Sequence, residues 1–292
     1  MKKLLQKLLV LDRRWIFLVI GLVVIIALVA PCTTSIGITT PVQSFYDIID
    51  NAEKDKPVLV SFDLGPSTLP ELEPMLRAVV RHAFLNDVQI IATAMLIQAP
   101  GIAERILVEV TEELNEEFED QGIDRRIEMG KDWVFLGFRA GVAAVMLGIG
   151  EEIRNVYPTD YYGTYLDDVP MMQNIHNYYD MSAVVTVSGT QIPESWVMYA
   201  GGPSGVPVLV GVTAVMAPNF YAYLQTGQMA GMLGGLKGAS EYERLMDYDG
   251  MATKGMIAQL WVHVTIVIFI LLGNVAYFVT RSGKKKRLSV QR

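Results

Sequence analysis

The sequence predicts an α/β fold: a doubly wound, mainly parallel, five-stranded Rossmann-like sheet, flanked by N- and C-terminal transmembrane helices. Short apolar runs alternate with longer amphipathic runs through the middle of the chain, which is the pattern of alternating strands and helices. The short runs are almost continuously apolar, as is typical of parallel strands covered on both faces. No Asp, Glu, Lys or Arg occurs in residues 15–46 or 255–280, so each stretch contains a candidate membrane span.

The five expected strands are the short apolar runs at residues 57–63, 88–95, 133–138 and 183–188 and a part of residues 206–216. Helices are expected at residues 68–86, 100–118, 141–156, 169–179, 193–200 and 219–236. The first of these helices has Ser67 or Thr68 as a candidate N-cap and Pro70 in its first turn. In the second, Ile106 and Val110 belong to a series of apolar residues at helical spacing.

The composition limits the class of protein. Hydrophobic residues make up 51% of the 292 residues and charged residues 19%, against about 25% charge in a typical soluble domain. The apolar content excludes a disordered chain. A single cysteine, Cys32, excludes a disulfide scaffold. Two long apolar segments are too few for a polytopic transporter.

The first apolar segment, residues 15–32, would span roughly 27 Å as a helix, which is enough to cross a hydrocarbon core. The alternative is a cleaved signal peptide. The apolar region of this segment is long for a signal peptide, and Pro31 is a poor residue for a cleavage site. An uncleaved membrane anchor is therefore favoured. The second segment, residues 256–280, is the longer of the two.

Charge sets the expected orientation. Residues 1–14 carry a net charge of +4 and residues 281–292 a net charge of +6. Because the whole chain has a net charge of −7, residues 15–280 have a net charge of −17. Because short basic flanks stay in the cytoplasm, both termini are predicted to be cytoplasmic and the acidic domain extracytoplasmic, in the cell (inner) membrane. The basic tail could instead be a nucleic-acid or headgroup patch. A stop-transfer flank is favoured, so no nucleic-acid partner is expected.

The predicted organisation follows from these segments. It comprises a basic N-terminus (1–14), transmembrane helix 1 (15–32), a linker and lead-in (33–56), the α/β domain (57–246), a second linker (247–255), transmembrane helix 2 (256–280) and a basic tail (281–292).

A ligand site is expected at the carboxyl edge of the sheet, where open α/β sheets bind their ligands. Five polar residues follow the expected strands and are the candidate ligand-binding residues: Asp63, Ser67, Arg139, Thr190 and Asn219. The alternative is that these side chains cap helices and satisfy turns.

Nucleotide binding is not indicated. The turn after the first strand reads DLGPST and lacks the G-x-G-x-x-G pattern. Gly148 and Gly150 fall inside an expected helix, and the glycine-rich residues 201–205 precede a strand rather than follow one. No cofactor is therefore expected.

Metal binding and catalysis have weak signals. The histidines His82, His176 and His263 are far apart in the sequence, and His82 is expected at the surface. The acidic loop at residues 157–168 could hold Ca²⁺, but its spacing is not that of an EF-hand. No G-x-S-x-G motif occurs, and Cys32 has no adjacent base. No metal site and no catalytic residue is predicted, while an enzyme is not excluded.

Three glycines, Gly227, Gly231 and Gly235, recur every four residues in the helix expected at 219–236. Such a stripe lets backbones approach closely, so these glycines are predicted to form an interface with another subunit. The alternative is that the glycine face packs on the chain's own sheet.

Two polar residues lie inside the second apolar segment. His263 and Asn274 are 11 residues apart, about three helical turns, so both should project from one face. Polar groups in hydrocarbon usually face protein or water. His263 could instead lie in the headgroup region.

The function predicted from these patterns is a non-catalytic structural or scaffold subunit of a membrane-embedded, oligomeric complex. Its expected partners are the lipid bilayer, further copies of the chain and other membrane subunits. The alternatives are a membrane-anchored small-ligand binding or sensor module and, third, a membrane-anchored hydrolase.

Overall fold

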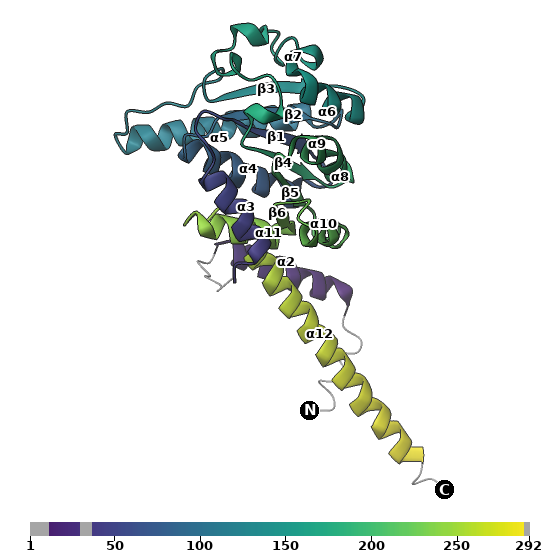
Figure 1. Cartoon of the computed structure of the whole chain (residues 1–292). Coiled ribbons are helices and arrows are strands. Elements are labelled where there is room, and N and C mark those ends of the chain that lie inside the picture. The colour runs from purple at the N-terminus through teal and green to yellow at the C-terminus, as the bar shows by residue number, and fades with distance from the viewer. Residues whose placement is uncertain (1–11, 30–36, 289–292) are drawn as a thin grey trace. The chain divides into compact units, whose positions relative to one another are not determined.

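The computed structural model describes residues 12–29 and 37–288, with side chains described as far as residue 279. The chain divides into two units (Figure 1). One is Ile36–Thr253, and the other combines Met1–Ser35 with Lys254–Arg292. Each unit is described by itself.

The first unit is built on a six-stranded parallel sheet, which confirms the predicted α/β class (Figure 1). The strands are β1 Val58–Asp63, β2 Ile90–Ala94, β3 Trp133–Phe138, β4 Ala183–Ser188, β5 Val208–Val212 and β6 Gly231–Gly234. The strand order is β3-β2-β1-β4-β5-β6, which is an order used by doubly wound sheets. The five predicted strands are all present, and the sixth, β6, was not predicted.

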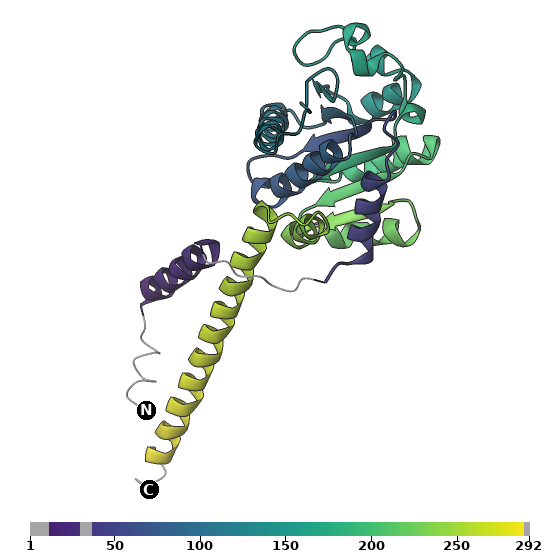
Figure 2. The same ribbon diagram turned by 90° about the vertical axis from the view of Figure 1, so that its left-hand side faces the viewer.

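Helices cover both faces of this sheet (Figure 2). One face carries α3 Thr40–Asp50, α4 Leu69–Leu85, α5 Pro100–Asp120 and α11 Gly235–Leu245. The other carries α6 Val142–Glu151, α7 Ile153–Val156 and α8 Ile192–Trp196, followed by a π-helix at Val197–Gly201. Two further short helices are α9 Gly202–Ser204 and α10 Tyr221–Gln225.

Strand β1 shows why the apolar runs are continuous. All six of its residues are buried. Val60 and Phe62 belong to the core under α4 and α5, whereas Leu59 belongs to the core under α6 and α8. Because successive side chains point to opposite faces, a strand buried on both faces needs apolar residues at nearly every position.

The prediction of a single helix at residues 219–236 is wrong. The segment contains a 3₁₀ turn, α10, and then β6. Gly227 lies in the turn before β6 with φ +74°, and Gly235 lies at the start of α11 with φ +58°. Gly231 lies in β6, where a Cβ atom would be 2.7 Å from the Cα and N atoms of Phe45 on α3. The glycines therefore serve two left-handed positions and one close approach within the chain, and the predicted interface loses the helix on which it depended.

Three other expectations about helices are corrected. The segment at 169–179 forms two 3₁₀ turns, Pro170–Met172 and Tyr178–Asp180, instead of one helix. The segment at 33–56, expected to be a linker and lead-in, contains α3. No separate helix was expected where α11 lies. The second of these 3₁₀ turns begins with a capping box, in which Asn177 accepts from the backbone and Asp180 reaches back.

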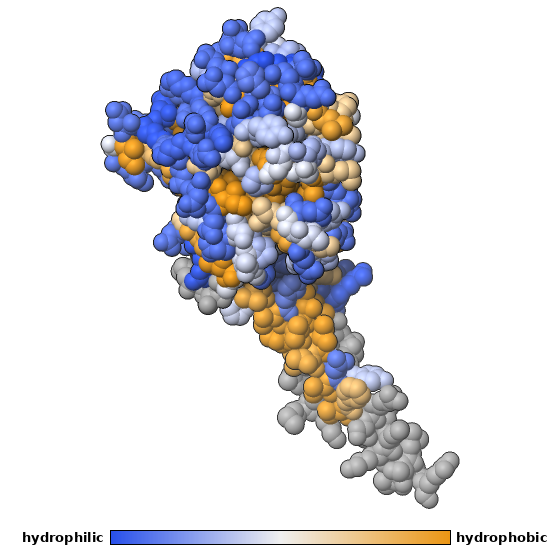
Figure 3. Space-filling model, in the orientation of Figure 1, coloured by the Kyte–Doolittle hydropathy of each residue, from blue (hydrophilic) through white to orange (hydrophobic). Residues whose placement is uncertain are grey.

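α12 Met251–Leu288, which belongs to the second unit from Lys254 onward, is the only described helix that is long and apolar enough to cross a membrane, over Met251–Val279. Much of its described surface is hydrophobic in Figure 3. α2 Arg13–Val29 has 17 residues, and the predicted first span at 15–32 continues into residues outside the described ranges, so it is not confirmed. His263 and Asn274 both lie exposed on α12, and their spacing on one continuous helix places them on the same face.

Candidate functional site

Five polar side chains lie buried in the carboxyl half of the sheet, on the face covered by α6 and α8. Each is 0% exposed: Ser61, Asp63, Thr93, Thr186 and Ser188. They alternate along their strands with residues of the other face, as strand geometry requires. The strand register pairs Ser61 with both Thr93 and Thr186, so the hydroxyls lie side by side across β2, β1 and β4.

Asp63 is the centre of this group. Its Oδ2 accepts hydrogen bonds from Ser61 Oγ at 2.7 Å and Thr186 Oγ1 at 3.2 Å. Its Oδ1 accepts from the backbone N–H of Met95 at 2.7 Å. Burial raises the pKa of Asp63 to about 6, although these hydrogen bonds act in the opposite direction. The carboxyl group is therefore held by neutral donors.

Tyr157 covers the same edge. Its hydroxyl lies 2.9 Å from Thr93 Oγ1, and the ring lies 5.7 Å from the guanidinium carbon of Arg139. Burial raises the pKa of Tyr157 to about 12, with the positive charge of Arg139 lowering it and the charge of Asp63 raising it. Arg139 therefore lies beside the ring of Tyr157, and a joint site with Asp63 stays a prediction.

The loops after β1 and β4 lie at the point where the strand order reverses, which is the usual ligand crevice of such sheets. Here the two loops pack against each other. A Cβ atom on Gly189 would lie 2.6 Å from Thr68 Cγ2. Thr68 Oγ1 in turn donates to the carbonyl of Gly65 at 3.0 Å, and Leu64 is fully buried. The chain itself therefore occupies the space beyond Asp63.

The five predicted ligand residues all lie at the carboxyl edge, but among the described residues no hydrogen bond joins any two of them. Asp63 is buried, whereas Ser67 and Arg139 are exposed. Thr190 Oγ1 accepts from the backbone N–H of Ile192 at 3.3 Å in the turn before α8, so the alternative that these side chains satisfy turns describes Thr190. Asn219 lies exposed in the 3₁₀ turn Ala217–Phe220. Thr68 occupies the N-cap position of α4 without a side-chain capping bond.

Sequence reasoning missed Ser61, Thr93, Thr186 and Tyr157. A signal was present, because each of the three strand residues interrupts an otherwise apolar run, as in VLVSFD, IIATA and AVVTVS. Once these runs are placed in register as neighbours, the three hydroxyls fall in one row.

His82 was expected at the surface, and this is wrong. It is 3% exposed, with Nδ1 2.7 Å from the hydroxyl of Tyr242 and Nε2 3.3 Å from Asp50 Oδ1. The ring of Tyr46 stacks on the imidazole, with the centroids 4.3 Å apart. Burial lowers the pKa of His82, while Asp50 acts to raise it. The surface expectation failed because α3 and α11, which bury this face of α4, were not predicted.

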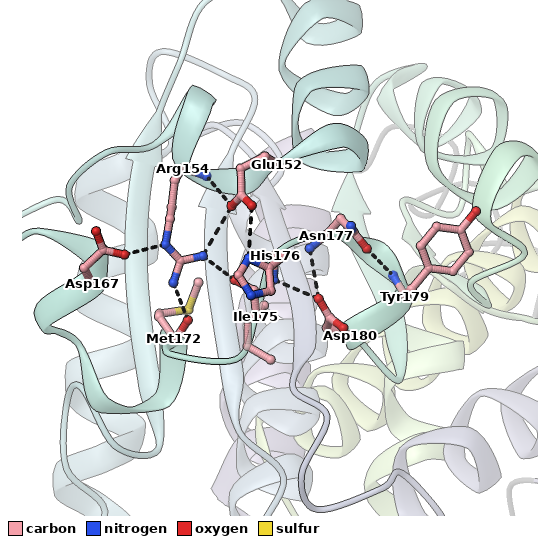
Figure 4. A network of polar contacts seen from close by, with 9 residues as sticks. All are labelled: Glu152, Arg154, Asp167, Met172, Ile175, His176, Asn177, Tyr179 and Asp180. Carbon is pink, nitrogen blue, oxygen red and sulfur yellow. Dashed lines mark hydrogen bonds and ion pairs between the residues drawn. The ribbon is translucent and has the colours of Figure 1, made fainter.

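The acidic loop weighed as a calcium site is bound by the chain itself (Figure 4). Arg154 donates to Asp167 Oδ1 at 2.7 Å and to the carbonyls of Met172 and Ile175. His176 Nδ1 lies 3.0 Å from Glu152 Oε2. These bonds fix the loop that follows α7. Among the described residues, no group of three or more His, Cys, Asp or Glu side chains is arranged to hold a metal ion.

Two further buried carboxylates lie on α11. Glu241 Oε2 accepts from the N–H of Thr39 at 2.8 Å and from its Oγ1 at 2.7 Å, just before α3. Glu243 Oε1 accepts from the N–H of Ala252 at 2.8 Å, and its Oε2 accepts from the N–H and Oγ1 of Thr253, each at 2.7 Å. Burial raises the pKa of Glu243 against these hydrogen bonds. Both carboxylates satisfy backbone N–H groups that have no partner within their own helices.

Comparisons with protein-family models, with curated proteins and with solved structures found no match. The arrangement of the chain's own residues is therefore the basis for its function. That arrangement consists of a carboxyl group enclosed by neutral donors, closed loops at the strand-order reversal, and two carboxylates that hold helix starts.

Proposed function

We propose that the protein is a non-catalytic structural subunit of a membrane-embedded, oligomeric complex. In this proposal, two transmembrane helices hold an extracytoplasmic α/β domain, and both termini are cytoplasmic. The observation that carries the proposal is the pair of carboxylates on α11, Glu241 and Glu243, which bind the starts of α3 and α12.

This pair determines how the chain enters and leaves the domain. Residues that follow the first apolar segment enter through Thr39, and residues that lead to the second apolar segment leave through Thr253. Both points are bound to one helix by short, charge-assisted hydrogen bonds, which are the stronger class. The segments by which the chain enters and leaves the domain are thus both bound to α11. Such a domain is suited to a structural subunit that holds other chains of a complex in position.

The carboxyl edge supports the same proposal. Asp63 is enclosed, and the loops after β1 and β4 pack over it, as Gly189 against Thr68 shows. A catalytic or ligating carboxylate must instead reach its substrate or ligand. Asp63 is better suited to joining β1, β2 and β4, since it accepts bonds from all three segments.

A small-ligand binding or sensor module is the second candidate. It is favoured by Arg139, which is exposed at the carboxyl edge and has no hydrogen bond or ion pair to any described residue. A ligand bound by Arg139 would lie at the protein surface, whereas Tyr157 and Asp63 are buried. The hydrolase alternative has no comparable observation in its favour.

The test is to isolate the full chain from its own membranes in a mild detergent, through a C-terminal affinity tag. The mass of the protein part is measured by light scattering, and the chains are identified by mass spectrometry. We expect a mass well above the 32.4 kDa of one chain, with further copies or other membrane chains present. A single chain without partners would contradict the proposal, and a small molecule on that chain would favour the second candidate.

A further inference from the structure

A pocket of about 430 Å³ lies at the amino edge of β5 and β6, opposite the edge that holds Asp63. Its walls come from three segments. These are the end of the π-helix with Val197 and Gly201, the lead into β5 with Val206, and the turn before β6 with Gly227 and Gln228. All of these residues belong to the unit Ile36–Thr253.

Four of the residues that line this pocket are glycines, Gly201, Gly202, Gly205 and Gly227. Gly202 and Gly205 belong to the run GGPSG before β5, and Gly227 belongs to the supposed stripe. A Cβ atom on Gly205 or Gly227 would meet nothing within 4 Å. Both glycines have a positive φ, +73° and +74°, so their backbone conformation favours glycine, and no side chain fills the space beside them.

The π-helix adds a second, independent observation. It runs over Val197–Gly201, and the N–H of Gly202 closes it on the carbonyl of Val197. π-Helices are rare and occur frequently at functional sites. Here the π-helix supplies one wall of the pocket through Val197 and Gly201.

The lining defines the chemistry of a ligand. No charged residue lines the pocket, and most of its side chains are apolar, including Val206, Pro207 and Ala230. The one polar side chain is Gln228. Its Oε1 accepts from Thr226 Oγ1 at 3.0 Å, and its NH₂ group donates to no described residue. Gln228 is exposed at the mouth of the pocket, so its NH₂ group is open to solvent and can donate to an incoming acceptor.

We propose that this pocket binds a small, neutral, apolar molecule that carries one hydrogen-bond acceptor, such as an ester or ketone oxygen, for Gln228. The volume lies in the range of small-molecule sites, about 300 to 1,000 Å³. A charged ligand is disfavoured, because nothing in the lining would replace its lost hydration. This site is separate from the structural role proposed above.

The test uses a neutral photoreactive probe, the methyl ester of 4-(trifluoromethyl-diazirinyl)benzoic acid. The full chain in lipid nanodiscs is irradiated with the probe, and the labelled peptides are mapped by mass spectrometry. We expect saturable labelling in peptides that cover residues 197–208 and 227–230, suppressed by excess methyl 4-tert-butylbenzoate. Labelling confined to residues 251–279, or labelling that the competitor does not reduce, would overturn the proposal.

Filling the pocket tests its position. A Cβ atom on Gly202 would be 3.5 Å from the carbonyl oxygen of Val197, an ordinary contact, so Gly202→Leu can extend into the pocket. Gly101→Leu is the matched control, because a Cβ atom there meets nothing within 4 Å and Gly101 lies at the start of α5. We expect Gly202→Leu to weaken labelling about tenfold or more and Gly101→Leu to leave it unchanged.

Two further variants keep the result decisive. If thermal unfolding shows that Gly202→Leu does not fold, Val206→Phe enlarges another side chain that lines the pocket. Gln228→Leu should weaken labelling by the ester probe but not by the corresponding probe without the ester group. Equal labelling of wild type and a folded pocket-filling variant would refute the site.

Discussion

Glu241 and Glu243, two residues apart on α11, bind the starts of two different helices. Positions i and i+2 on a helix point roughly 200° apart, so each carboxylate reaches a different neighbour. Glu241 accepts a hydrogen bond from the N–H of Thr39, just before α3. Glu243 accepts hydrogen bonds from the N–H groups of Ala252 and Thr253 in the first turn of α12. Each glutamate is 1% exposed, so both carboxylates make these bonds from buried positions.

Gly231→Ala should destabilise the domain. A Cβ atom at this position would lie 2.7 Å from backbone atoms of Phe45, and α3 would have to move away from β6. We expect a loss of about 1–3 kcal/mol in the free energy of unfolding, measured by urea denaturation. Gly101→Ala is the control and should be neutral or slightly stabilising, since it adds a good helix former where there is space. Equal stability of Gly231→Ala and wild type would show that the close approach is not present.

Asp63→Asn should remove a pH dependence of stability. The pKa of Asp63 is raised to about 6 by burial, so the folded protein favours the protonated form. Its contribution to stability is present below pH 3.8, the ordinary pKa, and is lost as the pH rises through 6, by about 3 kcal/mol. The difference in unfolding free energy between Asp63→Asn and wild type should therefore grow in favour of the variant from pH 4 to pH 7. A difference that is independent of pH would contradict the burial of an ionisable Asp63.

His82→Gln should remove a dependence of the opposite sign. Burial lowers the pKa of His82 below 6.5, so the folded state resists protonation. The wild type should therefore lose stability as the pH falls below 6.5, until the lower pKa of the folded state is reached. We expect the stability difference between wild type and His82→Gln to shrink over that range in thermal unfolding. The surface residue His176, changed to Gln, serves as the control.

The two termini should both lie on the cytoplasmic side. The prediction depends on the basic flanks at residues 1–14 and 281–292, which carry +4 and +6. In a variant with Cys32→Ser and Lys285→Cys, a membrane-impermeant maleimide should label the new cysteine only after the membrane is opened. Labelling from the outside of intact cells would reverse the orientation and place the domain in the cytoplasm.

The strands of the sheet could be predicted from the sequence more fully than the helices and loops around them. Parallel strands such as β1 and β4 could be predicted because each is a short, mostly apolar run between two helical segments. β6 could not, since GMLG is short and its glycines also fit a helical repeat. At the site, Asp63 was found from its place at the carboxyl end of β1. Its partner Thr186 was not, because which strand neighbours β1 is a property of the whole fold.

The most direct test of the account is hydrogen exchange at the backbone amides of Ala252 and Thr253 in Glu243→Gln. A glutamine keeps one acceptor oxygen and turns its NH₂ group toward the other donors, so one set of bonds to α12 is lost. With about 1–3 kcal/mol lost, protection in the peptide that begins α12 should fall roughly 5- to 150-fold, whereas the exposed control Glu112→Gln should leave it unchanged. Protection in Glu243→Gln equal to that of Glu112→Gln would contradict the claim that α11 holds the exit from the domain.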